Sequence, residues 1–146
     1  MTPSTGKRVD WWGLASLGCM LVAGCGGPEL VPVHGSVLYN DRPLEYGSVM
    51  LQPVGGGEIA RGTIQPDGTF ELALPDGSAG AAPGTYLVRI TAYEAQRAQS
   101  MGGTEREPAL GRSAIPGKYT SFRTSGLAAE VSPGMELPLV LKLEDE

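Results

Sequence analysis

The chain has 146 residues and a formal charge of −5, from 16 acidic and 11 basic side chains. The length is enough for one domain of common size, and the acidic balance argues against nucleic acid and against charge-driven binding to anionic lipid. One histidine and two cysteines give no basis for a zinc site of the Cys/His type.

Residues 1–24 are organised like a secretory signal segment. Lys7 and Arg8 form a short basic start, and an apolar run follows over 11–24. The run is too short to cross the ~30 Å hydrocarbon core as a helix. A basic start, an apolar middle and a small-residue exit are typical of a signal peptide. Cleavage is therefore expected between Gly24 and Cys25.

The small pair Ala23-Gly24 is followed directly by Cys25. The stretch Val22-Ala23-Gly24-Cys25 resembles the lipobox of bacterial lipoproteins, in which the cysteine thiolate accepts a diacylglyceryl group. The resemblance implies that acyl chains on Cys25 anchor the protein to a membrane, and two or more such chains hold firmly. Gly26 is not the Asp linked to inner-membrane retention in familiar lipoproteins, which favours the outer membrane.

An ordinary cleaved signal and an uncleaved anchor are the alternatives to the lipobox. Cys19 is a rival acceptor, but Leu17 stands where a small residue is needed and the apolar run before it is short. With Cys19 removed and Cys25 acylated, the mature domain would have no disulfide. It would be held together by its core alone.

From Val33 onward, apolar residues alternate with polar ones in short runs. Period-two alternation with β-branched and aromatic residues predicts β-strands. Phe70 and Tyr86 fall on the inward phase and are expected to be core anchors, and Pro138 predicts an edge strand or a bulge because it lacks an N–H. Seven strands are expected, at 33–39, 48–52, 59–64, 69–74, 85–92, 127–131 and 137–143.

Turn signals separate these runs, and the clearest is the tight hairpin predicted at Pro66-Asp67-Gly68. Short strands with regular turns favour a β-sandwich. We expect an all-β, seven-stranded antiparallel sandwich at 33–143. A tether at 25–32 would precede it and an acidic, solvated tail at 144–146 would follow.

A long polar segment at about 94–114 interrupts the strands. A connection of this length inside a compact domain is generally functional or disordered, and we expect a mobile insertion with at most one helical turn near its start. The candidate interaction residues around it are Arg97, Arg106, Arg112 and Tyr119. A disordered insertion without a binding role is the alternative.

Three motifs in this order resemble the carboxypeptidase regulatory-like domain: "VHGSVLYNDRPLEYGSVMLQP", "QPDGTFEL" and "PGTYLVRITA". The resemblance implies a prealbumin-like (transthyretin-like) or immunoglobulin-like Greek-key sandwich, used as an accessory module without catalytic residues. A further stretch, "IPGKYTSFRTSGLAAEV", looks like the closing motif of small secreted bacterial lipoproteins that carry this domain. Residues 93–114 have no counterpart in that family.

The expected function is that of a non-enzymatic, lipid-anchored and extracytoplasmic module for scaffolding or protein interaction. A domain that binds carbohydrate or another cell-surface ligand is the alternative. No catalytic residue, metal or cofactor is expected. His34 is interpreted as a strand-surface residue and Asp67 as a turn residue rather than a calcium ligand. The chain also lacks the several histidines and the Tyr-Arg-Gly-Ser end of the transthyretin-like hydrolase of 5-hydroxyisourate.

Overall fold

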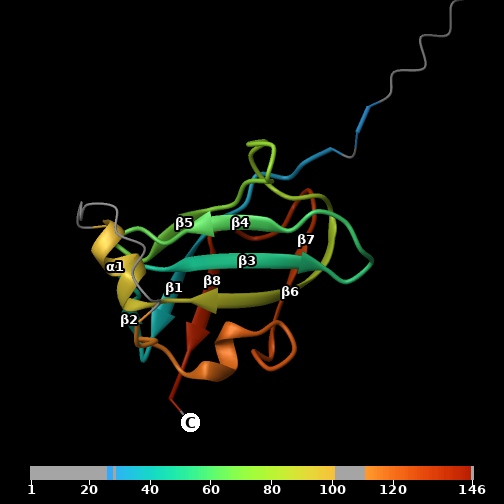
Figure 1. Cartoon of the computed structure of the whole chain (residues 1–146). Coiled ribbons are helices and arrows are strands. Elements are labelled where there is room, and N and C mark those ends of the chain that lie inside the picture. Colours follow the sequence, from blue (N-terminus) through green and yellow to red (C-terminus); the bar gives the residue numbers. More distant parts are fainter. Residues whose placement is uncertain (1–25, 28, 101–110, 146) are drawn as a thin grey trace, which may run out of the picture.

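The computed structural model describes residues 26–27, 29–100 and 111–145. They form two β-sheets packed face to face, with one short α-helix and one 3₁₀ turn beside them (Figure 1). The expected all-β sandwich is confirmed at this level. The expected signal peptide and Cys25 lie outside the described residues.

The first sheet is built around β1 (His34–Tyr39). The first half of β1 pairs antiparallel with β5 (Thr69–Glu71), and its second half pairs antiparallel with β2 (Arg42–Pro43). Along its other edge, β1 pairs in parallel with β8 (Leu139–Leu143). The expectation of a wholly antiparallel sandwich is therefore wrong at this pair.

The strand that follows Pro138 lies at an edge of this sheet, as the proline predicts. Within the described part of the chain, β8 pairs only with β1, and Pro138 immediately precedes it. The parallel direction has a simple cause. The chain reaches β8 from β7, which belongs to the other sheet, so no tight hairpin forces β8 to run against β1.

The second sheet has the order β4-β3-β6-β7 and is antiparallel throughout. Its strands are β3 (Ser48–Pro53), β4 (Ala60–Thr63), β6 (Gly84–Thr91) and β7 (Leu127–Val131). Each of the seven expected strands has a counterpart in the two sheets. The additional strand is β2, which follows a two-residue turn in which Asn40 and Asp41 have φ of 49° and 61°. Positive φ at both central residues is the geometry that closes a tight hairpin.

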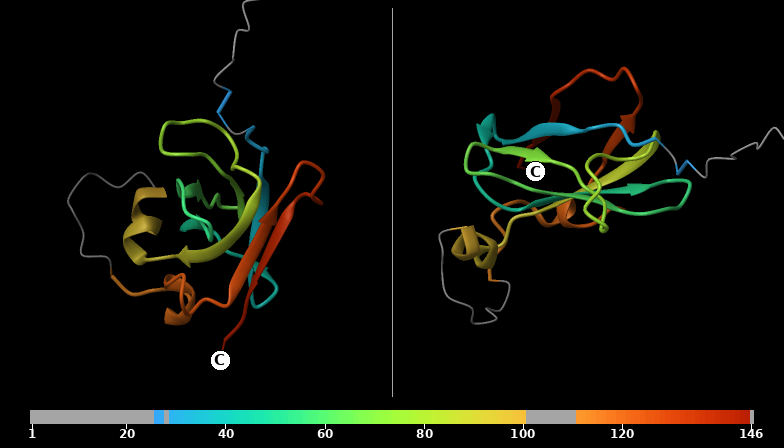
Figure 2. Two further views of the ribbon diagram at one scale, coloured as in Figure 1. Left: turned by 90° about the vertical axis from the view of Figure 1, so that its right-hand side faces the viewer. Right: turned by 90° about the horizontal axis from the view of Figure 1, so that it is seen from above.

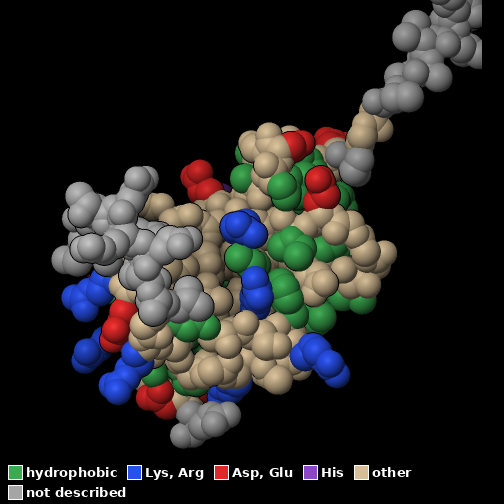
Figure 3. Space-filling model, viewed as in Figure 1, with side chains coloured by type: hydrophobic (Ala, Val, Ile, Leu, Met, Phe, Trp, Pro, Cys, Tyr) green, Lys and Arg blue, Asp and Glu red, His purple; other side chains and the backbone are tan. Residues whose placement is uncertain are grey.

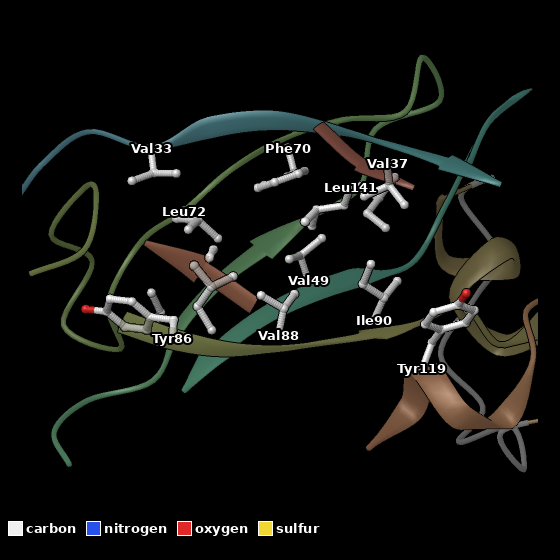
Figure 4. Close-up of a cluster of buried hydrophobic side chains, with 14 of the residues drawn as sticks. Val33, Val37, Val49, Phe70, Leu72, Tyr86, Val88, Ile90, Tyr119 and Leu141 are labelled. Carbon is white, nitrogen blue, oxygen red and sulfur yellow. The ribbon is translucent and has the colours of Figure 1, made fainter. Parts of the chain in front are cut away.

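The inward phase of the strands fills the space between the sheets (Figure 4). Phe70 and Tyr86, the expected core anchors, are 1% and 3% exposed. The Tyr86 hydroxyl donates a hydrogen bond to the Ala82 carbonyl at 2.7 Å, so its polar end is satisfied at the rim of the core. The buried residues of the strands also include Val37, Val49, Leu51, Val88, Ile90, Val131, Leu141 and Leu143, and Val33 is buried just before β1.

The expected tether and the expected insertion both contain more regular structure than the sequence predicts. Val31, placed in the expected tether, exchanges two backbone hydrogen bonds with Ala81, at 2.8 and 3.0 Å. The expected insertion begins with a helix longer than one turn, α1 (Glu94–Ser100). Its base is closed by an antiparallel bridge between Tyr93 and Ser113, while residues 101–110 lie outside the described residues.

Side-chain contacts dock α1 on the second sheet. The Gln96 carboxamide accepts a hydrogen bond from the Tyr93 N–H at 2.8 Å, which is half of a capping box. Its amide nitrogen lies 3.4 Å from the Ser48 hydroxyl. A second helical piece, the 3₁₀ turn η1 (Gly117–Thr120), lies after the segment. Both pieces lie at the same end of the sandwich (Figure 2).

Replacing the core aromatic Phe70 by alanine should strongly destabilise the domain. A Phe→Ala change in a core costs about 3–5 kcal/mol, out of about 5–15 kcal/mol for a whole domain. Thermal or urea unfolding of the full chain measures the loss. The matched control is Val54→Ala, because Val54 is 63% exposed and a surface change usually stays within about 0.5 kcal/mol. Equal midpoints for the two variants would show that Phe70 does not anchor the core.

Candidate functional site

The arginines expected to form an interaction loop are only partly described. Arg97 is exposed on α1, and Arg112 is exposed just before Ser113, where the segment returns to the domain. The two ends are joined by the backbone, because the Glu94 N–H donates to the Arg112 carbonyl at 3.1 Å. Arg106 lies outside the described residues. The structure therefore brings Arg97 and Arg112 to the base of one segment and leaves its binding role as a prediction.

The structure places Tyr119, the fourth candidate, in the core rather than on an interaction surface. Its side chain is 6% exposed. Its hydroxyl donates to the Glu144 carbonyl at 3.2 Å and accepts from the Glu144 N–H at 3.1 Å. Tyr119 therefore fixes the end of β8, and its ring is closed to a partner.

The acidic end of the chain is exposed, but it is held rather than free. The Tyr39 hydroxyl and the Asn40 amide both donate to the Asp145 carboxylate, the latter at 2.8 Å. These two donors lower the pKa of Asp145, the tyrosine more than the amide. The same hydrogen bond raises the pKa of Tyr39, because the carboxylate stabilises its protonated form.

His34 and Asp67 lie where the sequence analysis placed them. His34 is exposed on β1, opposite Glu71 of β5. Asp67 accepts hydrogen bonds from the Thr69 N–H at 3.0 Å and the Thr69 hydroxyl at 2.6 Å, which confirms its role in the turn. Among the described residues, no group of three or more His, Cys, Asp and Glu side chains is placed to hold a metal ion.

An open groove of about 900 Å³ surrounds His34. It lies where β1, β5 and the edge strand β4 meet, and Phe70 and Pro138 contribute its apolar part. Its polar lining comes from His34, Ser36, Arg61, Gln65, Thr69 and Glu71. The groove offers hydrogen-bond donors and acceptors to a small polar ligand.

The strongest arrangement lies on the outer surface of the second sheet. Met50 of β3 is aligned with Arg61 of β4 on one side and with Arg89 of β6 on the other. All three point away from the core, because the flanking Val49 and Leu51 on β3 are fully buried. We call this row, with the adjacent Leu87 and Phe122, the arginine face.

Arg89 is held in place by uncharged neighbours. Its Nε and Nη2 donate to the Met50 sulfur at 3.2 and 2.9 Å. Its guanidinium carbon lies 5.0 Å from the centroid of the Phe122 ring, a cation–π contact. Phe122 is fixed beside β6 because the Ser125 hydroxyl donates to the Val88 carbonyl at 2.5 Å. Arg89 is thus oriented while its charge is not neutralised by a carboxylate of the described residues.

The surroundings of Met50 and Arg89 are apolar or uncharged, while Arg61, at the edge of the row, also lines the groove that contains Glu71. Leu87, between the buried Tyr86 and Val88, is 37% exposed on the same surface. Arg61 is exposed and has no ion pair with a described carboxylate. Figure 3 shows two basic side chains in the middle of this surface, with hydrophobic and uncharged side chains around them and acidic ones toward the rim. The arginine face therefore combines positive charge with exposed apolar area.

No protein-family model, curated protein or solved structure matches the chain. Within the described ranges, no helix has the length and apolar character needed to span a bilayer. The assignment of a site accordingly rests on the residues of the chain itself.

The arginine face is absent from the residues expected to bind a partner, although part of its signal is present in the sequence. Met50 and Arg89 both lie on the outward phase of clear strands, so their exposure can be read from period two. Met50 and Arg89 are adjacent because of the register between β3 and β6. Met50 and Arg61 are adjacent because of the register between β3 and β4. Neither register follows from alternation alone.

Acidification should remove the contribution of Asp145 to stability. A carboxylate whose folded pKa is lowered stabilises the fold above its unfolded pKa of about 3.9, and the contribution is lost as the pH falls through the folded value. We expect Asp145→Asn to melt below the wild type at pH 7 and the difference to shrink in acid. Thermal melts over a pH series measure this. Glu144→Gln is the control, and an equal response of both variants would contradict the assignment.

Proposed function

We propose that this chain is a lipid-anchored, extracytoplasmic module that binds another protein of the cell envelope. The arginine face is the observation that carries the proposal. Arginine, methionine and aromatic residues are the types enriched in protein interfaces, and here Arg61, Arg89, Met50 and Phe122 share one surface. Exposed Leu87 adds apolar area beside them.

An anchor at Cys25 would suit this arrangement. The Val31–Ala81 pairing fixes the start of the domain at one end of the sandwich, a few residues after the expected lipidation site. The described N-terminal residues leave there, close to the plane of the sheets (Figures 1 and 2). An anchored molecule would therefore turn the arginine face sideways, toward neighbouring proteins.

We keep the carboxypeptidase regulatory-like domain as the proposed family. It is supported by the position of its motifs, since the Asp67 turn leads directly into Phe70 of the core and Pro83-Gly84 opens the longest strand. Its Greek-key, prealbumin-like topology belongs to the same proposal. The two-residue β2 and the parallel β1–β8 pair are the points at which this chain differs from a simple seven-stranded antiparallel description.

The groove around His34 favours a second candidate function, the binding of a carbohydrate or another small polar ligand. Its polar side chains, among them Gln65, Thr69 and Glu71, could hydrogen-bond sugar hydroxyls, and Phe70 supplies part of an apolar wall. We rank this function second because Phe70 is 1% exposed and offers almost no ring surface for stacking.

The anchor and the partner can be tested on one preparation of the full chain from its own cells. Detergent extraction followed by intact-mass measurement should find an acylated chain that begins at Cys25. A stoichiometric protein should co-purify with it. Cys25→Ser should accumulate as the unprocessed precursor, because the acceptor thiol is lost.

Cys19→Ser is the matched control and should be processed and acylated like the wild type. If Cys19→Ser blocks processing, the lipidation site is Cys19 and the assignment to Cys25 is wrong. Binding of the purified protein to a glycan array, with no protein co-purified, would replace the proposed function by the carbohydrate alternative.

A further inference from the structure

We infer that the arginine face binds an acidic segment of a partner protein, in which two carboxylates flank an apolar side chain. The inference rests on the proposed function and specifies its partner. The carboxylates would pair with Arg61 and Arg89, and the apolar side chain would lie on Met50 between them.

The charges of the chain support this partner. Acidic side chains exceed basic ones to give a formal charge of −5, yet no described carboxylate pairs with Arg61 or Arg89. Several acidic groups are used elsewhere, such as Asp76, which accepts from the Ser78 N–H at 2.8 Å, and Asp145 at the C-terminus. An acidic surface with a local basic centre selects a complementary acidic patch and repels other acidic surfaces.

The spacing of the row sets an approximate spacing for the partner's charges. Arg61 and Arg89 lie on the two strands that flank β3. Neighbouring strands are about 4.8 Å apart, so the two arginine backbones are separated by about 10 Å. The long side chains tolerate some variation around this value. A partner segment with carboxylates this far apart can engage both guanidinium groups at once.

Arg89 is already arranged for such a contact. Its N–H groups point at a thioether sulfur, a weak acceptor that a carboxylate can replace. The Phe122 ring also contacts the guanidinium and restricts it, which reduces the entropy lost on binding. A planar guanidinium can then take a carboxylate in a bidentate pair.

A protein segment fits this surface better than a glycan or a lipid headgroup. Arg89 covers one face of the Phe122 ring, with its guanidinium carbon 5.0 Å from the ring centroid, which leaves less ring area for a sugar to stack on. Met50 and the 37% exposed Leu87 give apolar area that a polyanionic glycan would not use. The net charge of −5 opposes approach to anionic lipid.

The test places a photo-cross-linking residue at Leu87 in the full chain, expressed in its own cells. Irradiation should link this position to one protein, and mass spectrometry should map the link to a segment with at least two Asp or Glu side chains. The double variant Arg61→Gln/Arg89→Gln should reduce the yield at least about tenfold, as expected for truncated interface arginines. Added salt should reduce the yield of the wild type.

The control is the same cross-linker at Val140, which is 47% exposed on β8 of the other sheet. Arg123→Gln controls for a general loss of positive charge. If the double variant lowers the melting temperature, Arg61→Gln alone keeps the test valid, because the exposed Arg61 side chain makes no hydrogen bond or ion pair with a described residue that the change would remove.

The outcomes separate the inference from the proposed function. Protein links at Val140 but not at Leu87 would overturn the inference and leave an interaction module. Links at Leu87 to a glycan, to lipid or to a segment without acidic residues would overturn it as well, as would a yield unchanged in the arginine variants. An absence of protein links from both positions would overturn the inference and the proposed function together.

Discussion

The close approach of three segments at Gly35 is the constraint on which the sandwich depends. A Cβ atom at this position would lie 2.1 Å from the Leu139 carbonyl oxygen and 2.7 Å from the Phe70 ring. Only a residue without a side chain lets β8 pair with β1 while Phe70 fills the core beside them. The inward-facing side chains of both sheets fill the core. Only the outward-facing side chains of the strands are therefore accessible to a partner.

Much of the fold could be predicted from the sequence, because its signals are local. The alternation of apolar and polar residues predicts Phe70 and Tyr86 in the core, where they lie. The turn at Asp67 lies between the two strands that it is expected to connect. The parallel direction of β8 could not be predicted, since alternation is the same in either direction. The two-residue β2 is too short to show a period. The helix at 94–100 depends on tertiary contacts of Gln96 with Ser48, which no local pattern contains.

The candidate site could be predicted much less well. The sequence favours the arginines of the irregular segment and Tyr119, because binding residues are often carried on loops. The burial of Tyr119 follows from its two contacts with the backbone of Glu144, far along the chain. The row of Arg61, Met50 and Arg89 is created by strand register, a long-range property. A regular sheet surface thus carries the strongest site in the described part of the chain.

The central claim is that charge on the arginine face selects the partner, and the methyl signal of Met50 tests it most directly. Full-length protein with ¹³C-methyl methionine would be titrated with a peptide that carries two Glu about 10 Å apart with Leu between them, and with its Gln counterpart. Met135, partly buried against the core, is the internal reference. We predict that the Glu peptide shifts the Met50 signal, that the Gln peptide and Met135 show no change, and that about 0.5 M salt reverses the shift. Equal shifts with both peptides, or a response at Met135 without one at Met50, would contradict the account.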